Sequence, residues 1–432
     1  MLDITRKQWM VLFAAWLGWG FDVFDALLFS YVAPNCVPTL LHLTIGSVEA
    51  KAASLYWTGL LTSMLLVGWA IGGVLFGVIC DRIGRVRTMM LTMIVYALGT
   101  AACALAPNIW ALVIFRAVAS LGIGGEWAAG AAMVSEAMPD HRRVAAGALL
   151  YTASPIGLFL ATFVNFQIAG VWFVTEPEVS WRYVFLFGLV PAFVAFIVRS
   201  FIPESSLWER NQQANAPRVQ LRELFSDDYR RITLTGASLS LVTLIAWWSS
   251  NAFIPVVVTT WAQSAAHIQQ LSQEAGLALS EEWKLRATFW FNLGGLLGTL
   301  LTIPFAQWLG RRAMFTIYFV ASALSIFAIF GVDWPNEVRL YLYVFIGIFV
   351  FGVCSAFTYY LPELFPTRLR ATGAGFCFNI GRVIAAAGPY IVGSIAAHGE
   401  TTRALFFVGV VPLLGLLLLP LAPETRGKEL SA

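Results

Sequence analysis

The sequence predicts an all-α integral membrane protein whose twelve transmembrane helices form two pseudo-symmetric six-helix bundles. Composition and an internal repeat carry this prediction. Of the 432 residues, 59% are hydrophobic and only 12% are charged, whereas an ordinary soluble domain is about 25% charged. A helix needs roughly 20 apolar residues to cross a hydrocarbon core about 30 Å thick. Runs of that length recur along the whole chain, so no soluble domain of useful size remains.

Twelve segments are long and apolar enough to span the bilayer. They are residues 9–34, 55–79, 88–106, 109–132, 143–171, 182–202, 232–261, 285–306, 313–331, 338–361, 371–397 and 402–421. We expect residues 1–202 to form the N-terminal bundle, 203–231 a polar cytoplasmic loop, and 232–432 the C-terminal bundle. The first span holds two acidic residues and lacks a small-residue cleavage site, which favours a retained helix over a signal peptide.

Lysine and arginine alternate sharply between successive loops. The loops on one side, together with both chain ends and the 199–231 segment, hold 19 basic residues, and the loops on the other side hold six. Only Arg116 and Arg382 are then left inside spans. By the positive-inside rule, both termini and the central loop are expected to be cytoplasmic, in an inner or plasma membrane.

The two halves of the chain repeat each other at three polar motifs. The pairs are Glu136-x-x-Pro139 with Glu363-x-x-Pro366, Asp81-Arg-Ile-Gly-Arg with Gln307-Trp-Leu-Gly-Arg, and Pro203-Glu-Ser with Pro423-Glu-Thr. Chance similarity between hydrophobic chains does not easily place three polar motifs at matching positions. Substrate sites in folds built from such repeats lie near mid-membrane at the interface of the two halves.

These motifs resemble those of the major facilitator superfamily. Gly77-x-x-x-Asp81-Arg82-x-Gly84-Arg85-x-Arg87 is similar to the loop signature of that superfamily, and the two Pro-Glu-Ser/Thr segments resemble the half ends of its sugar porters. Phe115-Arg116 with the following Gly-Ile-Gly-Gly-Glu126-Trp, and Phe21-Asp22-Val-Phe-Asp25, resemble its proton-coupled organic-anion symporters (sialate, monocarboxylate or aromatic-acid). The resemblance implies the major facilitator fold. Gln307 replaces the second acidic residue, which predicts weaker gating contacts in one half. Span seven lacks the paired glutamines of sugar porters, which argues against a sugar.

Two aspartates lie three residues apart near the middle of span one, Asp22 and Asp25. They share a helix face, and two like charges so close in a low-dielectric cavity cannot both ionise cheaply. One of them is therefore expected to hold a proton, as a coupling site requires. The alternative is that one aspartate only orients a neighbouring group while it faces water.

Arg382 lies about twelve residues into span eleven, three residues after Asn379. The surrounding segment resembles span eleven of organic-anion transporters, which implies that this arginine engages the anion. A guanidinium stays charged when buried and binds a carboxylate through two parallel hydrogen bonds. The alternative is a structural ion pair with an acid of the other half. Asn379 is expected to help Arg382 bind the substrate. Further candidates for the substrate site combine rings and polar groups in helices expected to line the cavity: Trp247, Asn251, Asn292 and Tyr359.

Span four contains Arg116 and Glu126, which are ten residues apart and therefore cannot form one local pair. Arg116 could reach the carboxylates of span one, in either a structural or a coupling role. Glu126 is expected to have a structural or gating role, paired with loop arginines near Asp81, with direct proton transfer as the weaker alternative.

A cluster of charged residues at the predicted cytoplasmic ends resembles the gate of the superfamily. Its members are Asp81, Arg82, Arg85, Glu136 and Arg142, with Glu363 and Arg368 in the second half. Exposed ion pairs stabilise a fold little. The expected role is to hold the two bundles together on this side, and the alternative is a plain topology signal.

The function expected from these features is proton-coupled symport of a small organic anion, most simply a monocarboxylate, by alternating access. A sugar or polyol facilitator is the alternative, and a sensor that binds without transport is a third. No nucleophile–base pair or metal cluster points to an enzyme, and no cofactor or metal is expected. The five scattered cysteines read as core residues. The expected partners are the lipid bilayer, protons and the anion, and nucleic acid is not expected to bind. The protein is expected to function as a monomer.

Overall fold

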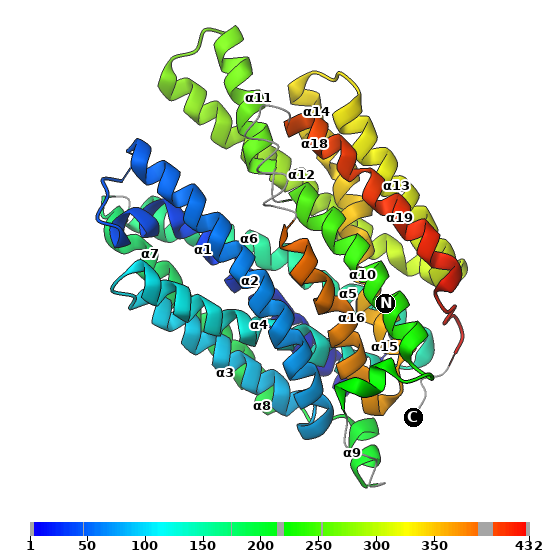
Figure 1. The fold of residues 1–432 in the computed structure, drawn as a ribbon. Helices are drawn as coiled ribbons and strands as arrows, with labels where there is room; N and C mark the ends of the chain where they lie inside the picture. Colours follow the sequence, from blue (N-terminus) through cyan, green and yellow to red (C-terminus); the bar gives the residue numbers. More distant parts are fainter. Residues whose placement is uncertain are drawn as a thin grey trace.

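The computed structural model describes residues 4–45, 47–173, 175–213, 220–251, 254–387 and 401–428. Within these ranges every regular element is a helix (Figure 1). The helices fall into an N-terminal half, α1 to α8, and a C-terminal half, α10 to α19, joined by a central segment. The central segment is more structured than the predicted loop, because it carries a short helix, α9 (Ser206–Gln213), and a 3-10 turn, η3 (Leu221–Phe225).

The N-terminal half contains six predicted spans, two of which are divided into shorter helices. Its elements are α1 (Arg6–Leu40), α2 (Val48–Ile83), α3 (Arg85–Ala104), α4 (Ile109–Ala137), a turn η1 (Asp140–Arg142), α5 (Arg143–Tyr151), α6 (Ala153–Asn165), a π-helix η2 (Phe166–Trp172), α7 (Pro177–Phe187) and α8 (Leu189–Ser200).

The C-terminal half follows the same order. Its elements are α10 (Arg230–Asn251), α11 (Ile254–Ile268), α12 (Gln273–Trp308), α13 (Arg311–Gly331), α14 (Asn336–Ile346), a π-helix η4 (Gly347–Phe351), α15 (Gly352–Leu364), a turn η5 (Thr367–Leu369), α16 (Arg370–Ala385), α18 (Thr401–Val408), α19 (Val410–Leu418) and a turn η6 (Leu419–Leu421).

The described helices agree with a many-span membrane protein. In the described part of the chain, nine helices are long and apolar enough to cross a membrane, or ten if the bent pair Arg6–Ala26 and Tyr31–Leu40, with 45° between its parts, counts as one span. Leu405–Leu421 is a shorter apolar stretch at the position of predicted span twelve. Predicted span eleven begins as α16, but its residues 388–397 lie outside the described ranges.

Local sequence explains where the long helices begin and end. The side chains of Thr5, Ser47 and Asn108 accept hydrogen bonds from the first turns of α1, α2 and α4 and so cap them. Glycines with positive φ, Gly84 at 111° and Gly310 at 90°, form the tight turns after α2 and α12. A left-handed backbone is strained for other residues. The same turn at matching positions is a structural counterpart of the sequence repeat.

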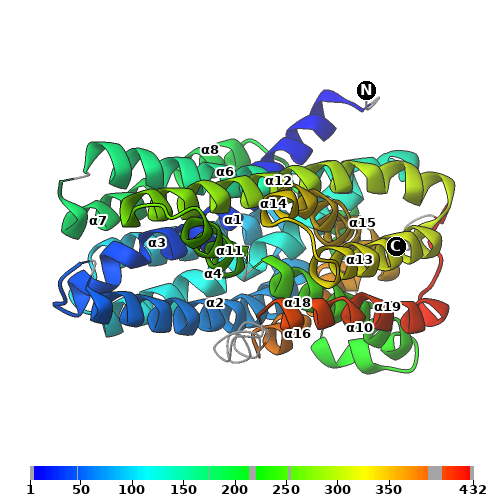
Figure 2. The ribbon, with the colours of Figure 1, turned by 90° about the horizontal axis from the view of Figure 1, so that it is seen from above.

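The two halves contact each other mainly through α2 with α16 and through α5 with α12 and α15. Figure 1 shows these helices together near the lower end of the molecule, whereas α7 and α11 stand well apart at the upper end. Figure 2 places both ends of the chain toward one end of the helices. We call this end, where the α2–α3, α4–α5 and α8–α9 connections also lie, the latch face.

Candidate functional site

A small cavity of about 40 Å³ lies between the two halves. It has room for about three water molecules, so a larger solute requires lining side chains to move. Both halves contribute to its wall, and half of the wall residues are aromatic. They are Trp19, Val23, Ala26, Trp69, Tyr151 and Ser154 from α1, α2, α5 and α6, and Leu244, Trp247, Trp248, Cys354, Phe378 and Arg382 from α10, α15 and α16.

Arg382 supplies the only charged side chain among the described residues of this wall. It is 3% exposed, and its guanidinium carbon lies 4.2 Å from the Trp69 ring centre and 4.8 Å from that of Phe378. Arg382 Nη1 donates to Asn379 Oδ1, while Nε has no partner in the described chain. No carboxylate of the described residues pairs with it. The cation is thus held by two rings and one amide.

The other predicted substrate-site residues are placed in three different environments. Trp247 lines the cavity, and Asn379 lies buried behind Arg382. Asn251, Asn292 and Tyr359 do not line it: Asn251 is half-buried at the end of α10, Asn292 is buried in α12, and the Tyr359 ring lies 5.9 Å from the Arg311 guanidinium, toward the latch face. The structure therefore brings together Arg382, Trp247 and the adjacent Trp248 with three aromatic residues of the N-terminal half that sequence reasoning did not single out: Trp19, Trp69 and Tyr151.

Asp25 lies in a network that fixes its carboxylate. Thr100 Oγ1 donates to Asp25 Oδ2 at 2.6 Å, and Arg116 Nη1 lies 3.5 Å from Asp25 Oδ1. Arg116 also donates to the backbone oxygen of Ala26 at 3.1 Å. The predicted contact between Arg116 and a carboxylate of span one is present, and it is made to Asp25.

Glu126 forms a buried ion pair with Arg199 of α8 instead of the expected contact with loop arginines near Asp81. Thr92 Oγ1 also donates to Glu126 Oε2, at 3.2 Å. Arg199, which the loop count placed in the central segment, is 0% exposed and bonds the Met89 oxygen at 3.1 Å. The prediction was wrong because Arg199 lies in the last turn of α8, where a loop arginine and an intramembrane arginine look alike in sequence.

Asp22 is the third carboxylate of this half, and it is 0% exposed. Neither of its oxygens has a hydrogen-bond partner among the described residues. Gly18, one turn earlier on α1, is so close to the Glu126–Arg199 pair that a β-carbon there would overlap both head groups. The intramembrane part of the N-terminal half thus holds three buried carboxylates and two arginines. The two arginines pair with Asp25 and Glu126, so neither pairs with Asp22.

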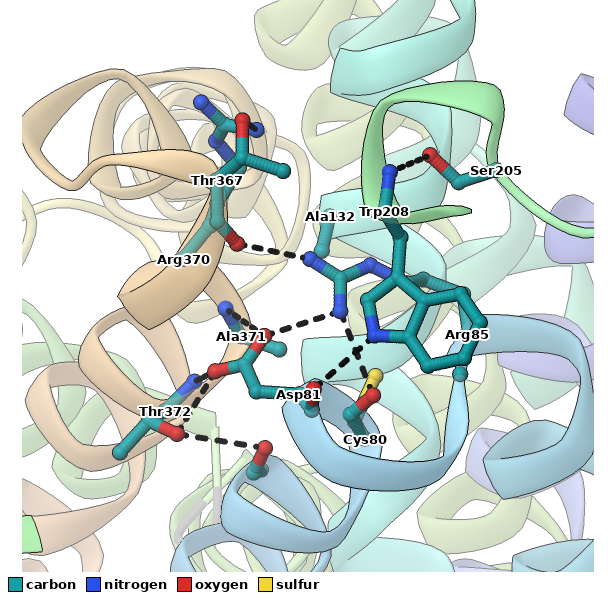
Figure 3. Close-up of polar contacts among 12 residues, drawn as sticks. Cys80, Asp81, Arg85, Ala132, Ser205, Trp208, Thr367, Arg370, Ala371 and Thr372 are labelled. Carbon is teal, nitrogen blue, oxygen red and sulfur yellow. Dashed lines mark hydrogen bonds and ion pairs between the residues drawn. The ribbon is translucent and has the colours of Figure 1, made fainter. Parts of the chain in front are cut away.

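On the latch face, Arg85 connects several elements (Figure 3). Its Nη2 donates to Glu136 at 2.7 Å and to the Thr367 oxygen at 3.0 Å, and its Nη1 lies 3.0 Å from Asp81 Oδ1. Arg370 of the other half reaches the same Glu136 carboxylate at 2.9 Å. These side chains are fully or almost fully buried, so this is not a set of exposed surface ion pairs.

Asp81 joins α2 to the first turn of α16 (Figure 3). Its Oδ2 accepts hydrogen bonds from the backbone N–H and the hydroxyl of Thr372, both at 2.7 Å, and Oδ1 accepts from the Ala371 N–H at 3.3 Å. A carboxylate at a helix N-terminus satisfies otherwise unpaired N–H groups and interacts favourably with the helix dipole. Asp81 therefore caps a helix of the opposite half.

The C-terminal half repeats most of this arrangement. Arg311 Nη2 bonds Glu363 at 2.8 Å, and Arg143 of the N-terminal half lies 3.8 Å from the same carboxylate. Ser205 donates to Glu136 at 2.5 Å, and Thr425 donates to Glu363 at 2.6 Å.

A second glutamate in each half binds the start of the helix after the glycine turn. Glu204 accepts from the N–H groups of Arg85 and Val86, and Glu424 from those of Arg311 and Arg312. Burial raises the pKa of Glu424, but its backbone N–H donors lower it more, so the pKa lies below the usual range.

Three predicted gate residues lie outside the buried network. Arg82 is exposed, Arg142 is half-buried in η1, and Arg368 pairs with Glu223 of the central segment at 2.5 Å. Sequence reasoning missed Arg370, Glu204 and Glu424, although a signal existed. Arg370 repeats Arg143 at the 227-residue offset of the glutamate motif, and both glutamates lie in the Pro-Glu-Ser/Thr segments.

In the described part of the chain, no group of three or more His, Cys, Asp or Glu residues is arranged to hold a metal ion. The site consists of one cavity with a single cation, two buried ion pairs and an unpaired carboxyl in the N-terminal half, and two related arginine networks on the latch face.

Comparison with known proteins places this arrangement in a family. The chain is 28% identical to the cis,cis-muconate transport protein of Acinetobacter baylyi, over 95% of each chain. It is also 28% identical to the probable 4-methylmuconolactone transporter of Cupriavidus pinatubonensis, over 98% of this chain and 92% of the relative. Its fold matches a solved structure of the proton:xylose symporter XylE, with a TM-score of 0.74, 19% identity and 98% of each chain covered. The family model of the Major Facilitator Superfamily matches residues 9–389, so this chain is a multi-pass membrane transporter of that superfamily and not an enzyme.

Proposed function

We propose that the protein is a secondary transporter that couples the entry of protons to the uptake of a small organic anion with one carboxylate bound at Arg382. A single observation carries this proposal: Arg382 is a buried cation in the wall of the central cavity and has no carboxylate partner among the described residues.

A buried charge without a partner is costly, because the protein does not replace the water that the charge has lost. A substrate carboxylate supplies the missing partner and binds a guanidinium through two hydrogen bonds. No second Lys or Arg contributes to the described wall, and aromatic rings make up most of the remainder. The wall therefore suits one carboxylate attached to an apolar or unsaturated body.

The relatives support an organic acid as the solute. Their names specify cis,cis-muconate and 4-methylmuconolactone, and both compounds carry carboxylate groups. The XylE structure supports the fold alone and does not argue for a sugar.

The charges of the N-terminal half support proton coupling. Arg116 pairs with Asp25 and Arg199 with Glu126, which leaves Asp22 without a cation. An ionised carboxylate buried without a partner costs several kcal/mol or more, so Asp22 is the group that holds the transported proton in this conformation. When the cavity opens to the other side of the membrane, water reaches Asp22 and accepts the proton. The excess of basic loop residues on the latch face makes that face cytoplasmic.

Uptake by the purified protein in liposomes tests both parts of the proposal. The labelled panel consists of benzoate, nicotinate, cis,cis-muconate and, as a neutral solute, xylose. We expect an inward proton gradient to accelerate uptake of at least one acid and leave xylose unaffected. Arg382→Ala should abolish acid uptake, whereas Arg286→Ala, which removes an exposed arginine paired with Glu282, should not change it. The proposal is contradicted if the proton gradient does not change acid uptake, if Arg382→Ala still takes up acid, or if xylose is taken up faster than the acids.

The proton site has its own test in the same liposomes. Asp22→Asn should remove accumulation driven by the proton gradient but leave exchange of labelled for unlabelled acid, because exchange requires no net proton movement. Asp25→Asn serves as the matched variant, and it should disturb the Arg116 contact and slow exchange as well. If Asp22→Asn still accumulates acid in response to the gradient, the assignment of the proton to Asp22 is wrong.

A further inference from the structure

One face of α2 meets one face of α16 in four successive contacts. Trp69, Gly73, Gly77 and Asp81 recur every four residues on α2, so they form one stripe that spans about 18 Å of helix. At its cavity end the Trp69 ring lies against Arg382. At its latch end Asp81 binds Thr372.

The two middle contacts are unusually close because they are made by glycines. A β-carbon at Gly77 would lie 3.0 Å from the Ala371 oxygen, and one at Gly375 would lie 2.8 Å from the Gly73 oxygen. A β-carbon at Gly73 would overlap the amide group of Asn379. The Asn379 side chain thus lies directly on the α2 backbone, and no other residue type at position 73 leaves room for it.

Both ends of the Asn379 amide are already used. Nδ2 donates to the Gly375 oxygen at 2.9 Å, and Oδ1 accepts from Arg382. The side chain is 0% exposed and does not line the cavity. Asn379 therefore has no free face for a solute, although the sequence had suggested it as a direct ligand.

We propose that Asn379 is a positioning residue that Gly73 clamps against Arg382, so that the anion site is complete only while α2 and α16 are in contact. This inference rests on the proposed role of Arg382. It makes the α2–α16 contact a physical link between the cavity and the Asp81–Thr372 contact on the latch face. Separation of the two helices at the latch would remove the Gly73 backbone from the Asn379 side chain, which would allow the amide to turn away from Arg382 on the same helix.

The link is reciprocal by thermodynamic necessity. If the anion binds more tightly while α2 and α16 touch, then bound anion must favour that contact by the same factor. Anion binding should therefore hold the latch face closed, and a weakened latch should lower the affinity for the anion at a site three turns away.

Two substitutions of Asn379 separate a positioning role from a merely structural one. In Asn379→Asp the new carboxylate pairs with Arg382 and competes with the substrate, so we expect affinity to fall about 100-fold or more, as for other close buried charge pairs. Asn379→Ala removes the hydrogen bonds to Arg382 and to the Gly375 oxygen but adds no charge, and we expect a loss of about tenfold. A structural role predicts the reverse order, because Asp preserves the volume of the side chain and Ala does not.

The pH dependence of Asn379→Asp provides a second readout. Protonation of the introduced carboxylate at acidic pH breaks its pair with Arg382, so binding should recover as the pH falls, and Asn379→Ala should show no such recovery. Affinity is measured as equilibrium binding of the panel acid that the wild-type protein takes up fastest. The apparent melting temperature of each variant in detergent confirms that it is folded.

The clamp itself is tested by Gly73→Ala, which should lower affinity at least as much as Asn379→Ala. Gly130→Ala is the matched control, because a β-carbon there meets only the Ala15 side chain at an ordinary 3.7 Å. Asp81→Asn, remote from the cavity, should lower affinity several-fold.

The outcomes distinguish the two proposals. Wild-type protein that binds none of the acids refutes the proposed function and this inference with it. Wild-type binding together with equal losses in Asn379→Asp and Asn379→Ala, or with unchanged affinity in Gly73→Ala and Asp81→Asn, refutes the inference alone.

Discussion

The two arginine networks on the latch face are built from nearly the same parts. In each network, the arginine that follows a glycine turn binds a glutamate at the end of the fourth span of its half, in α4 or α15. A Ser or Thr hydroxyl binds that same glutamate. A second glutamate accepts the first N–H groups of the helix that carries the arginine. An arginine of the opposite half completes each network, Arg370 at Glu136 and Arg143 at Glu363.

They differ at one position, where the first network has Asp81 and the second has Gln307. Asp81 binds the first turn of α16 through three hydrogen bonds. Among the described residues, Gln307 makes no such hydrogen bond to the first turn of α5. The crossing contact is also shorter on the first side, 2.9 Å against 3.8 Å. The α2–α16 side of the latch is therefore the more strongly bonded of the two.

This difference shows where the pseudo-symmetry of the scaffold breaks. The shared parts hold each half together at its own helix turns. The Asp81 carboxylate strengthens one crossing contact only, and that contact involves α16, the helix that also carries Arg382. The helix pair α2 and α16 thus carries both the more strongly bonded contact of the latch face and the cation of the cavity.

The largest expected effect comes from removing the central arginine of each network. Arg85→Ala leaves Asp81 and Glu136 without their shared cation, and we expect it to cost about 3–5 kcal/mol, the usual penalty for breaking a buried ion pair. Arg311→Ala should cost less, because it removes the main cation of one buried carboxylate, Glu363, instead of the shared cation of two. The apparent melting temperature in detergent measures both, with Arg286→Ala as the exposed control. Equal losses would show that Asp81 adds nothing to the first network.

Much of this comparison is visible in the sequence, because polar motifs in an apolar chain stand out. The repeat predicted two related bundles, and the lost acid at Gln307 predicted weaker contacts on one side. Charges within apolar spans identified Arg382 and the approach of Arg116 to span one. These features can be predicted because they depend only on residue type and on order along the chain.

Other parts of the site depend on how each helix is rotated and where it ends. Asn251 lies one turn beyond Trp247 on the same face of α10, α12 contributes no described residue to the cavity wall, and Tyr359 lies beside Arg311 toward the latch face. Periodicity alone does not fix where along a helix the cavity lies or which helices line it. The Glu126–Arg199 pair was missed since Arg199 lies at the edge of span six. The clamp of Asn379 on Gly73 needs the distance between two helix axes, which no pattern in one sequence provides.

A smaller effect is expected when only the asymmetric residue is changed. Asp81→Asn keeps the size of the side chain but removes its charge, and hydrogen bonds to charged groups are worth about 1.5–3 kcal/mol. The latch should open more often, and the rate of maleimide labelling should rise, because all five cysteines are buried in the closed form. Cys80, next to Asp81, should account for the increase, so the same variant with Cys80→Ala should label no faster than wild type. Gln307→Ala is the matched change in the other network and should leave labelling unchanged; a similar rise there would mean that the two sides are equivalent.

The smallest expected effects come from the hydroxyl groups that the networks share. Ser205→Ala and Thr425→Ala each remove one hydrogen bond to a buried glutamate that keeps its arginine. Ser205→Ala also removes the bond at 3.3 Å that its hydroxyl accepts from the Trp208 N–H at the start of α9. Each bond to a glutamate should cost only about 1 kcal/mol, and Ser205→Ala should exceed Thr425→Ala by no more than the cost of a lost helix cap, about 1 kcal/mol. Apparent melting temperatures of the two variants, with Ser226→Ala in the central segment as the control, provide the measurement. A loss for Ser205→Ala beyond that margin would mean that the asymmetry extends beyond Asp81 into the Glu136 site itself, where Arg370 crosses from the other half.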